Sequence, residues 1–468
     1  MRHLLWVCAL AFSASAASGQ QPDTIVRQPA LDGIHAADSL DLALRPDCVE
    51  QRTDTVQSRA TPSGAVTDSL CLTRRQAVAQ ALAHNPQLQV AAEQIAQAHA
   101  RKVQGTAIPD PAFSAVFDQS PGLFGAGGGT ERSVSASLTI PFLDKFRLQG
   151  RVGTADVRSA TFSAALTRQL IVSQTSQTYD SLLAALRRAR DLGEARALAL
   201  DFVRRAQARY SAGTTPKLDL VRAQVELAQA ENQLIANARD LANARAALNR
   251  LVGRPLGAPI AAADSLAVPP ELPELDTLEA AALATRPELG DLRSQQEGAR
   301  AATGLAREYW LPDLTIGISR DYADPGPGVL FTGVSLPIPL LFWQHSRGEI
   351  GEARHRELEL AAAFRDLQGQ VGQDVRAAYA AAAAALRQAV YLRDQLLPLA
   401  RRAYRIASVS YGLGGSSALE LIDARRNLLD AESQYTDALA AANSTRADLQ
   451  RAAATPLDAF ETGDRHDR

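Results

Sequence analysis

The sequence is poor in the residues that build compact mixed cores and reactive sites. Among 468 residues there is one methionine, aromatic residues make up 5%, and the three cysteines and seven histidines are scattered. Together with abundant alanine, this composition suits long helices better than a mixed globular core. No pair of histidines has metal-ligand spacing, and no Ser-His-Asp, phosphate-loop or paired-carboxylate pattern stands in a supporting context. We therefore predict no metal site, no cofactor and no enzymatic activity.

A strong charge bias and long hydrophobic runs are missing as well. The formal net charge is −2, whereas a nucleic-acid partner would require a strongly basic face, so we expect no nucleic-acid partner. No run after residue 20 is long and apolar enough for a membrane helix. Any part of the mature chain that crosses a membrane must then be a strand of a closed barrel, because only helices and closed barrels satisfy their backbone groups in lipid.

The beginning of the chain predicts export. Residues 1–19 have the pattern of a signal peptide, with Arg2 as the positive start, an apolar core and small residues at the cleavage region. Residues 20–71 are polar, and we expect a poorly ordered N-terminal segment. Cys48 and Cys71 remain after cleavage. An even pair in an exported chain indicates one disulfide, although two buried thiols would also fit.

The stretch around which the chain is organised occurs twice, as residues 210–250 and 411–451, at a constant offset of 201. Asn85-Pro86 and Arg286-Pro287 share that offset, so the duplication covers nearly the whole mature chain. The domains expected are therefore a first repeat, a Pro-rich linker, a second repeat and a polar tail. Their boundaries are 72–253, 254–274, 275–454 and 455–468.

Each copy reads as a tight turn that enters a long helix, with tips near 210–217 and 411–418. Gly213 and Gly414 suit the left-handed backbone that ends a helix. Thr215 is expected to cap the next helix, with Pro216 at the first helical position. In the second copy, Ser417 and Glu420 have capping-box spacing.

Beyond the turns, leucines recur every seven residues, which predicts helices supercoiled on their neighbours. They are Leu220, Leu227, Leu234, Leu241 and Leu248. Alanine beside them allows close approach, and residues 151–210 would span about 90 Å as one helix. Four arginine pairs are expected on solvated helix faces. They are Arg187-Arg188, Arg204-Arg205, Arg401-Arg402 and Arg425-Arg426.

Between the helices of each half the period becomes two, which predicts strand hairpins at 111–141 and 313–339. Val134, Ala136, Leu138 and Ile140 alternate with serine and threonine, and each strand has the 9–11 residues that cross a bilayer when tilted. Aromatic residues at the strand–helix junctions indicate a membrane interface. They are Phe142, Phe146, Tyr309, Trp310, Phe342 and Trp343. Aromatic plugs beneath a soluble sheet are the alternative, but they leave the polar faces without a role.

Four strands cannot close a barrel, because the smallest bacterial barrels have about eight. Chains must therefore pool their hairpins, and three chains would give twelve strands. The expected fold is mainly α with a β-barrel part. Internally duplicated coiled-coil hairpins form an α-barrel, and four transmembrane strands per chain join a trimeric 12-stranded β-barrel.

These features together resemble the outer-membrane efflux proteins, the TolC family, over about residues 72–454. The resemblance is carried by the two x-Pro breaks and the duplicated strand pairs. It is carried also by the Tyr-x-x-Gly turns before Leu-Asp-Leu-Val-Arg-Ala (218–223) and Leu-Glu-Leu-Ile-Asp-Ala (419–424). The stretch 336–354 looks most like the heavy-metal-efflux branch. The resemblance implies a passive outer-membrane exit duct of a tripartite efflux or type I secretion system.

What the resemblance implies further is a homotrimer in the bacterial outer membrane, in contact with lipid, whose helical part lies in the periplasm. Its partners would be a periplasmic adaptor (membrane fusion protein) and an inner-membrane pump. A secreted coiled-coil scaffold or adhesin without a pore is the alternative from another class.

The resemblance also assigns roles to residues at the helical tips. Those matching the adaptor-contacting turns are Gly213, Thr214, Thr215, Gly414, Gly415 and Ser416. Glu420 and Asp423 match acids that project into the closed aperture, where threefold symmetry would gather six carboxylates; stabilisation of the helix start is the other interpretation. Asp219 and Tyr411 match the network that holds the gate, in which Ser416 replaces the expected basic partner.

Overall fold

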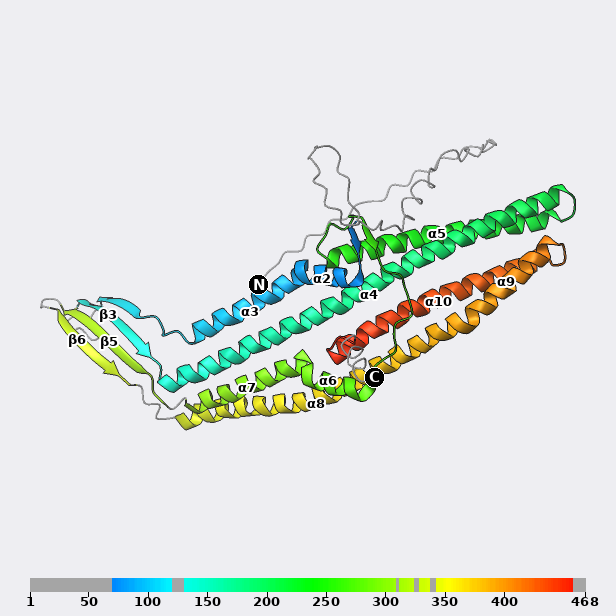
Figure 1. The fold of residues 1–468 in the computed structure, drawn as a ribbon. Coiled ribbons are helices and arrows are strands. Elements are labelled where there is room, and N and C mark those ends of the chain that lie inside the picture. The colour runs from blue at the N-terminus through cyan, green and yellow to red at the C-terminus, as the bar shows by residue number, and fades with distance from the viewer. Residues whose placement is uncertain (1–69, 120–129, 309–310, 324–327, 337–341, 458–468) are drawn as a thin grey trace, which may run out of the picture. The chain divides into compact units, whose positions relative to one another are not determined.

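The computed structural model describes residues 70–119, 130–308, 311–323, 328–336 and 342–457. Both repeats have the same order of elements (Figure 1). The first contains α2 (Arg74–His84), α3 (Pro86–Gly105), β2 (Ala112–Gln119), β3 (Thr130–Ile140), α4 (Leu143–Ser211) and α5 (Lys217–Leu251). The second contains α6 (Leu275–Thr285), α7 (Pro287–Arg307), β5 (Leu314–Ala323), β6 (Val329–Ser335), α8 (Phe342–Tyr391), η3 (Leu392–Leu396), α9 (Leu397–Gly412) and α10 (Ala418–Ala453).

The break between α2 and α3 follows from Asn85-Pro86. Asn85 ends α2 and caps α3, where its side chain accepts a hydrogen bond of 2.9 Å from the amide of Gln87. Pro86 suits the first helical turn because it has no N–H to satisfy. The Asn85 amide also donates to the carbonyl of Leu251 at 3.0 Å, which fixes this corner to the end of α5. In the described part of the chain, no helix combines the length and hydropathy needed to cross a membrane.

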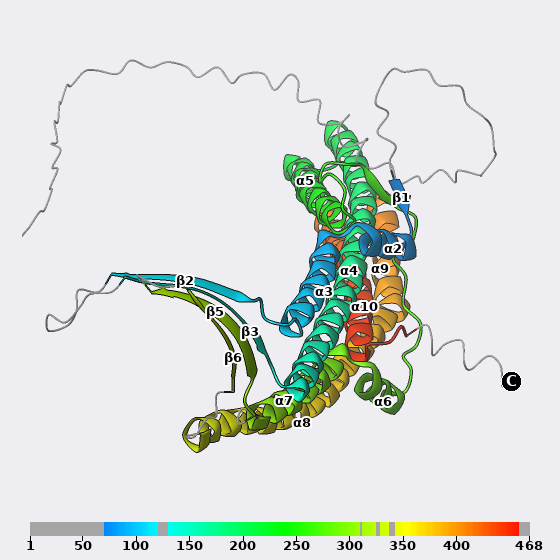
Figure 2. The ribbon, with the colours of Figure 1, turned by 90° about the vertical axis from the view of Figure 1, so that its left-hand side faces the viewer.

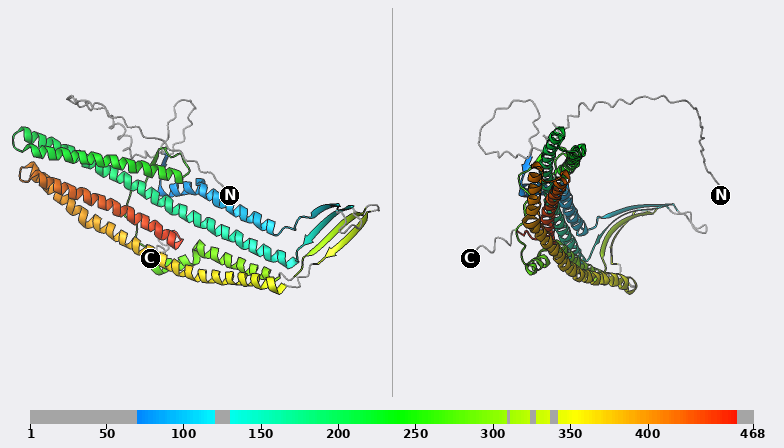
Figure 3. Two further views of the ribbon diagram at one scale, coloured as in Figure 1. Left: turned by 180° about the vertical axis from the view of Figure 1, so that it is seen from behind. Right: turned by 90° about the vertical axis from the view of Figure 1, so that its right-hand side faces the viewer.

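Helix α4 lies at the centre of the helical layer. It packs against α3 and α5 on one side and against α7 and α10 on the other, and α8 packs against both α7 and α10. Figure 3 shows the same order from behind. The heptad positions predicted to face neighbours do so, except that Leu227 is only half-buried. Leu220, Leu234, Leu241 and Leu248 are buried in α5, and Leu421, Leu428 and Leu449 in α10. A continuous helix was expected over 151–210, and α4 confirms it with 69 residues.

The second repeat departs from the first in its long helix. Where α4 is unbroken, the equivalent helix contains a π-helical turn, η3, between α8 and α9. Pro398 stands in the first turn of α9. A proline removes an i→i−4 backbone hydrogen bond from a helix. π-Helical turns form where the series of helical hydrogen bonds is interrupted.

The four longer strands form one antiparallel sheet in the order β2-β3-β5-β6, so the β3–β5 pair joins the two hairpins. Figure 2 shows that the sheet is curved. Leu138 faces Ile316 and Ser135 faces Ser319 across this pair. On the polar face the Ser114 and Ser135 hydroxyls lie 2.7 Å apart, and those of Thr139 and Thr315 lie 3.0 Å apart.

Strand β6 alternates less regularly than β3. Thr332 pairs with Ile318 and therefore lies on the apolar face. Phe331 pairs with Ser319 on the polar face. The period of two fixes both positions once the register is set.

A second, two-stranded sheet was not foreseen. β1 (Leu70–Leu72) pairs in parallel with β4 (Ile260–Ala262). The end of the segment expected to be poorly ordered is thus a strand, and the Pro-rich linker supplies its partner. This sheet could not be predicted, because three-residue strands carry almost no periodicity. Cys71 in β1 is disulfide-bonded. Its expected partner Cys48 lies outside the described residues, and the Cys48–Cys71 pairing stays a prediction.

Candidate functional site

The two helical turns close in the same way. Gly213 has φ 72° and Gly414 has φ 81°, so the predicted left-handed backbone is confirmed at both. The amide of Thr214 donates to the carbonyl of Arg209 at 3.0 Å, and that of Gly415 to Ser410 at 2.8 Å. These bonds satisfy carbonyls that would otherwise be left free at the helix ends.

Helix capping beyond the turns differs from the expectation. Thr215 does not cap α5: Pro216 holds the cap position with no side-chain bond, and the Thr215 hydroxyl is buried without a partner among the described residues. Proline at the cap shifts the helix start to Lys217 and moves Thr215 out of reach. Ser417 does cap α10, since its hydroxyl accepts from the Glu420 amide at 3.3 Å. Only that half of the expected capping box forms within the described chain.

Tyr411 lies in the apolar cluster beneath the turns and is only 2% exposed. Its ring meets that of Phe202 edge to face, with centroids 5.6 Å apart. The hydroxyl is buried and has no hydrogen-bond partner in the described structure. Burial raises the pKa of Tyr411, helped by the nearby charge of Asp219 and opposed by Arg209. Asp219 and Tyr411, predicted to act in one network, are therefore electrostatic neighbours.

A basic side chain does meet Tyr411, and it comes from the other repeat. The guanidinium of Arg209, near the end of α4, lies 4.7 Å from the Tyr411 ring centroid, and its Nη1 donates to the Tyr411 carbonyl at 3.0 Å. Ser416, which occupies the expected basic position, instead donates to the Ala407 carbonyl of α9 at 3.3 Å, within its own hairpin. Arg209 was not predicted, because the basic partner of Tyr411 was expected at Ser416, on the same hairpin.

The two acids assigned to the aperture lie on the opposite face of α10 from its core. Glu420 and Asp423 are exposed, whereas Leu421 and Ile422 are buried. They stand three residues apart, so both carboxylates project from one helical face. This placement is compatible with an aperture role and with a helix-start role for Glu420.

Arg425 corrects the prediction that the arginine pairs are solvated. It is 3% exposed, donates to the Ala195 carbonyl of α4 at 2.8 Å and lies 3.9 Å from Glu226 of α5. Arg426, which is exposed, contacts the same carboxylate at 2.5 Å. Burial lowers the pKa of Arg425. The charge is compensated by Glu226, as a buried ion requires.

Of the six junction aromatics, the structure describes two side chains. Phe142 is exposed and Phe146 half-buried. The Phe142 amide contacts Asp313 Oδ1 at 3.3 Å, and Lys145 contacts the same carboxylate at 2.8 Å, which ties the start of α4 to β5. Tyr309 and Trp310 lie outside the described residues, as do the side chains of Phe342 and Trp343.

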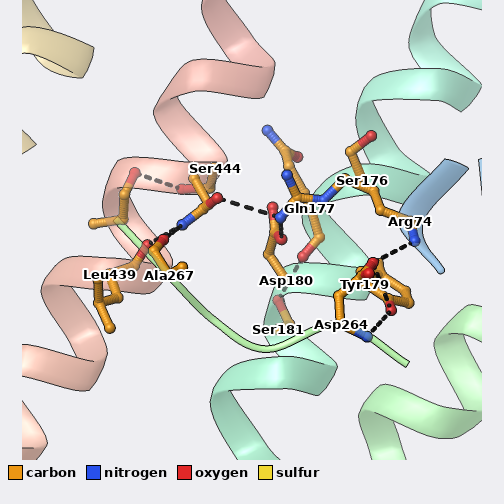
Figure 4. Close-up of polar contacts among 12 residues, drawn as sticks. Arg74, Ser176, Gln177, Tyr179, Asp180, Ser181, Asp264, Ala267, Leu439 and Ser444 are labelled. Carbon is orange, nitrogen blue, oxygen red and sulfur yellow. Dashed lines mark hydrogen bonds and ion pairs between the residues drawn. The ribbon is translucent and has the colours of Figure 1, made fainter. Parts of the chain in front are cut away.

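A polar cluster midway along α4 was also missed (Figure 4). Tyr179 donates to the Leu72 carbonyl at 2.8 Å and lies 3.0 Å from Asp264 of the linker. Arg74 pairs with Asp180 and donates its amide to Asp264 at 2.7 Å. The cluster joins β1, α2, α4 and the linker. Each of these bonds joins residues more than 80 positions apart in the sequence, so no local spacing could reveal the cluster.

The fold is that of solved outer-membrane channels. A membrane protein from Pseudomonas aeruginosa superposes with a TM-score of 0.70 at 20% identity, covering 86% of this chain and 99% of that one. The CmeC outer membrane channel of Campylobacter jejuni gives 0.69 at 18% identity, covering 84% and 89%. Likeness at this identity shows the fold alone.

The family follows from sequence comparison. The model of the outer membrane efflux protein family matches residues 77–254 and again 278–455, at the same offset of 201 as the repeats. The chain belongs to this family and is a transport protein of the outer membrane. It is 24% identical over 372 residues to the cobalt-zinc-cadmium resistance protein CzcC of Cupriavidus metallidurans, covering 79% of this chain and 86% of that protein.

Proposed function

We propose that this protein is the exit duct of a tripartite efflux system, working as a homotrimer that docks a periplasmic adaptor and an inner-membrane pump. The observation that carries the proposal is the four-stranded sheet. Among the described residues, its outer strands β2 and β6 each pair on one side only, and large apolar residues on the sheet stay exposed. An unpaired edge is unstable in lipid. Pooling the sheets of three chains closes those edges into a 12-stranded barrel.

The turns at the other end of α4 supply the gate and the docking surface in this proposal. Gly213 and Gly414 have open space around their Cα hydrogens, and the turns leave backbone accessible to an adaptor. Glu420 and Asp423 are exposed beside them. In a trimer they would form a ring of six carboxylates that attracts cations.

Similarity to a cobalt-zinc-cadmium resistance protein favours divalent metal cations as cargo. In this proposal the pump selects the cargo upstream. The duct therefore contributes an opening that attracts cations, and not a cargo-binding site.

Recording from planar bilayers tests the proposal directly. Detergent-extracted protein is expected to give discrete, cation-selective conductance steps, and deletion of the gene together with its pump should lower tolerance to cobalt, zinc and cadmium salts. A secreted scaffold would give neither, and it would be absent from the outer-membrane fraction. Normal metal tolerance with intact channel activity would reject the metal cargo and leave the duct standing.

A further inference from the structure

The apolar face of the sheet carries two arginines at the end of the strands that lies away from the helices. Residues opposite one another in register share a face. Arg132 of β3 pairs with Tyr322 of β5, and Val134 pairs with Arg320. The two arginines are therefore diagonal neighbours, on the same face as Leu138. Both of their side chains are exposed.

The charges at this end of the sheet are divided between its two faces. Asp321 follows Arg320 directly, but it pairs with Ser133 and so lies on the polar face. Within the part of the chain that the structure describes, neither Arg132 nor Arg320 forms an ion pair with a carboxylate. In the proposed barrel the apolar face meets lipid. Cations on such a face require an anionic partner or an aqueous boundary, since hydrocarbon does not solvate them.

The position of the arginines along the strand places them at such a boundary. Ten positions separate Phe142, at the junction with α4, from Arg132 (142 − 132 = 10). At about 3.3 Å per residue and a tilt of about 40°, they span roughly 25 Å along the membrane normal. That is about the height of the apolar band of a membrane barrel. The arginines thus stand at the level of the headgroups in the outer leaflet.

An aromatic ring holds one of the two cations in place. The guanidinium carbon of Arg320 lies 5.1 Å from the centroid of the Tyr322 ring. That ring lies against Gly328, where an added Cβ would come within 2.7 Å of Tyr322 Cδ1. An arginine stacked on a ring can still bind phosphate oxygens through its N–H groups. Tyrosine is itself typical of the membrane interface.

We propose that Arg132 and Arg320 bind the phosphate groups of the outer-leaflet glycolipid, lipopolysaccharide. Two cations one diagonal step apart match a headgroup that carries more than one phosphate. Its acyl chains would cover the exposed aliphatic side chains next to them, Val134 and Ile318, which a free phosphate ion cannot do. This inference rests on the proposed function, because only a barrel with periplasmic helices puts this face in lipid and this end of the strands outside.

Native mass spectrometry of the detergent-purified protein tests the site, with diphosphoryl lipid A and its dephosphorylated form as probes at equal concentration. The wild-type protein should bind the diphosphoryl form several-fold better, and a tenfold excess of inorganic phosphate should not displace it. Arg132→Gln with Arg320→Gln should bind both forms equally, whereas Arg132→Lys with Arg320→Lys should keep part of the preference. The matched control, Arg101→Gln with Arg354→Gln, removes the same charge from exposed positions on α3 and α8 and should bind like wild type.

Planar-bilayer conductance of the same preparations separates this inference from the proposed function. Conducting wild-type trimers that bind both probes equally overturn the lipid site and leave the duct standing. A phosphate preference that survives in the double glutamine variant overturns the assignment to these arginines. A monomer without conductance overturns both the duct and the lipid site. The double glutamine variant itself should conduct like wild type, because the arginines lie on the face away from the lumen.

Discussion

At the scale of single residues, the contact between Arg209 and Tyr411 joins the two turns of one chain. Arg209 both stacks on the Tyr411 ring and binds its carbonyl. A half-exposed cation over a buried aromatic ring contributes about 1–2 kcal/mol, and the hydrogen bond adds to it. The hairpins can separate at the tip only if this contact breaks.

Arg209→Ala should therefore weaken closure of the tip. We expect a larger open fraction in planar-bilayer recordings, with unchanged single-channel conductance of the fully open state, because the duct itself is untouched. Arg205→Ala is the matched control, since Arg205 is exposed on the same helix and pairs locally with Asp201 at 2.7 Å. Equal open fractions in the two variants would remove Arg209 from the gate.

Asp180 predicts a pH dependence of stability. Burial raises its pKa from 3.8 to about 6 and outweighs the attraction of Arg74. Between these two values the folded chain holds a proton that the unfolded chain has released. The free energy of unfolding therefore falls as pH rises through this window.

When the pH is lowered from 7 to 4, the free energy of unfolding of the wild-type protein should rise by about 2 kcal/mol relative to that of Asp180→Asn. Thermal unfolding in detergent, followed by circular dichroism, measures the difference, with the exposed Asp240→Asn as control. A difference between wild type and Asp180→Asn that stays constant with pH would contradict the assignment.

How much of the site the sequence could predict depends on distance along the chain. The left-handed glycines and the cap at Ser417 rest on local chemistry and were predicted. Arg209 and Arg425 were missed because each acts on a helix from the other repeat, and only the fold brings those helices together.

At the scale of elements, the strands allow the sharpest test of contact with lipid. Leu138 lies on the apolar face opposite Ile316, and its neighbour Ser137 lies on the polar face opposite Gly317. Leu138→Arg should cost about 2–4 kcal/mol in the membrane and reduce the amount of protein in the outer-membrane fraction. Ser137→Arg should insert normally and lower cation conductance, because it adds a positive charge to the lumen. Equal insertion of both would count against a lipid-facing apolar side.

Element prediction succeeded where periodicity is long and failed where it is short. Five heptads specify α5, and eleven alternating residues specify β3, because in each case many residues follow the same period. Three-residue strands such as β1 and β4 have no such average, and the π-helical turn at η3 interrupts a helix whose pattern continues on both sides. Pro398 is the only local sign of that turn, and it marks one copy of the repeat alone.

At the scale of the whole molecule, the proposed trimer must cover aliphatic side chains that a single chain leaves exposed on α5, such as Ile235. Ile235→Asp should therefore lower the trimer fraction in native mass spectrometry while leaving the helical content of the chain unchanged, because Ile235 is exposed in a single copy. Ile235→Val retains an aliphatic surface and should stay trimeric. A trimer unaffected by the aspartate would place the contact elsewhere.

In the proposed trimer, the acids beside the second turn would gain a collective role. One chain offers Glu420 and Asp423 on an exposed helical face, where solvent screens them. Three chains would bring six carboxylates around one axis, and their summed potential would attract cations. Glu420→Ala with Asp423→Ala should reduce cation selectivity several-fold, most clearly at low salt. Asp201→Ala, which removes an acid from α4, should not. Unchanged conductance and selectivity in the double variant would confine both acids to stabilising the start of α10.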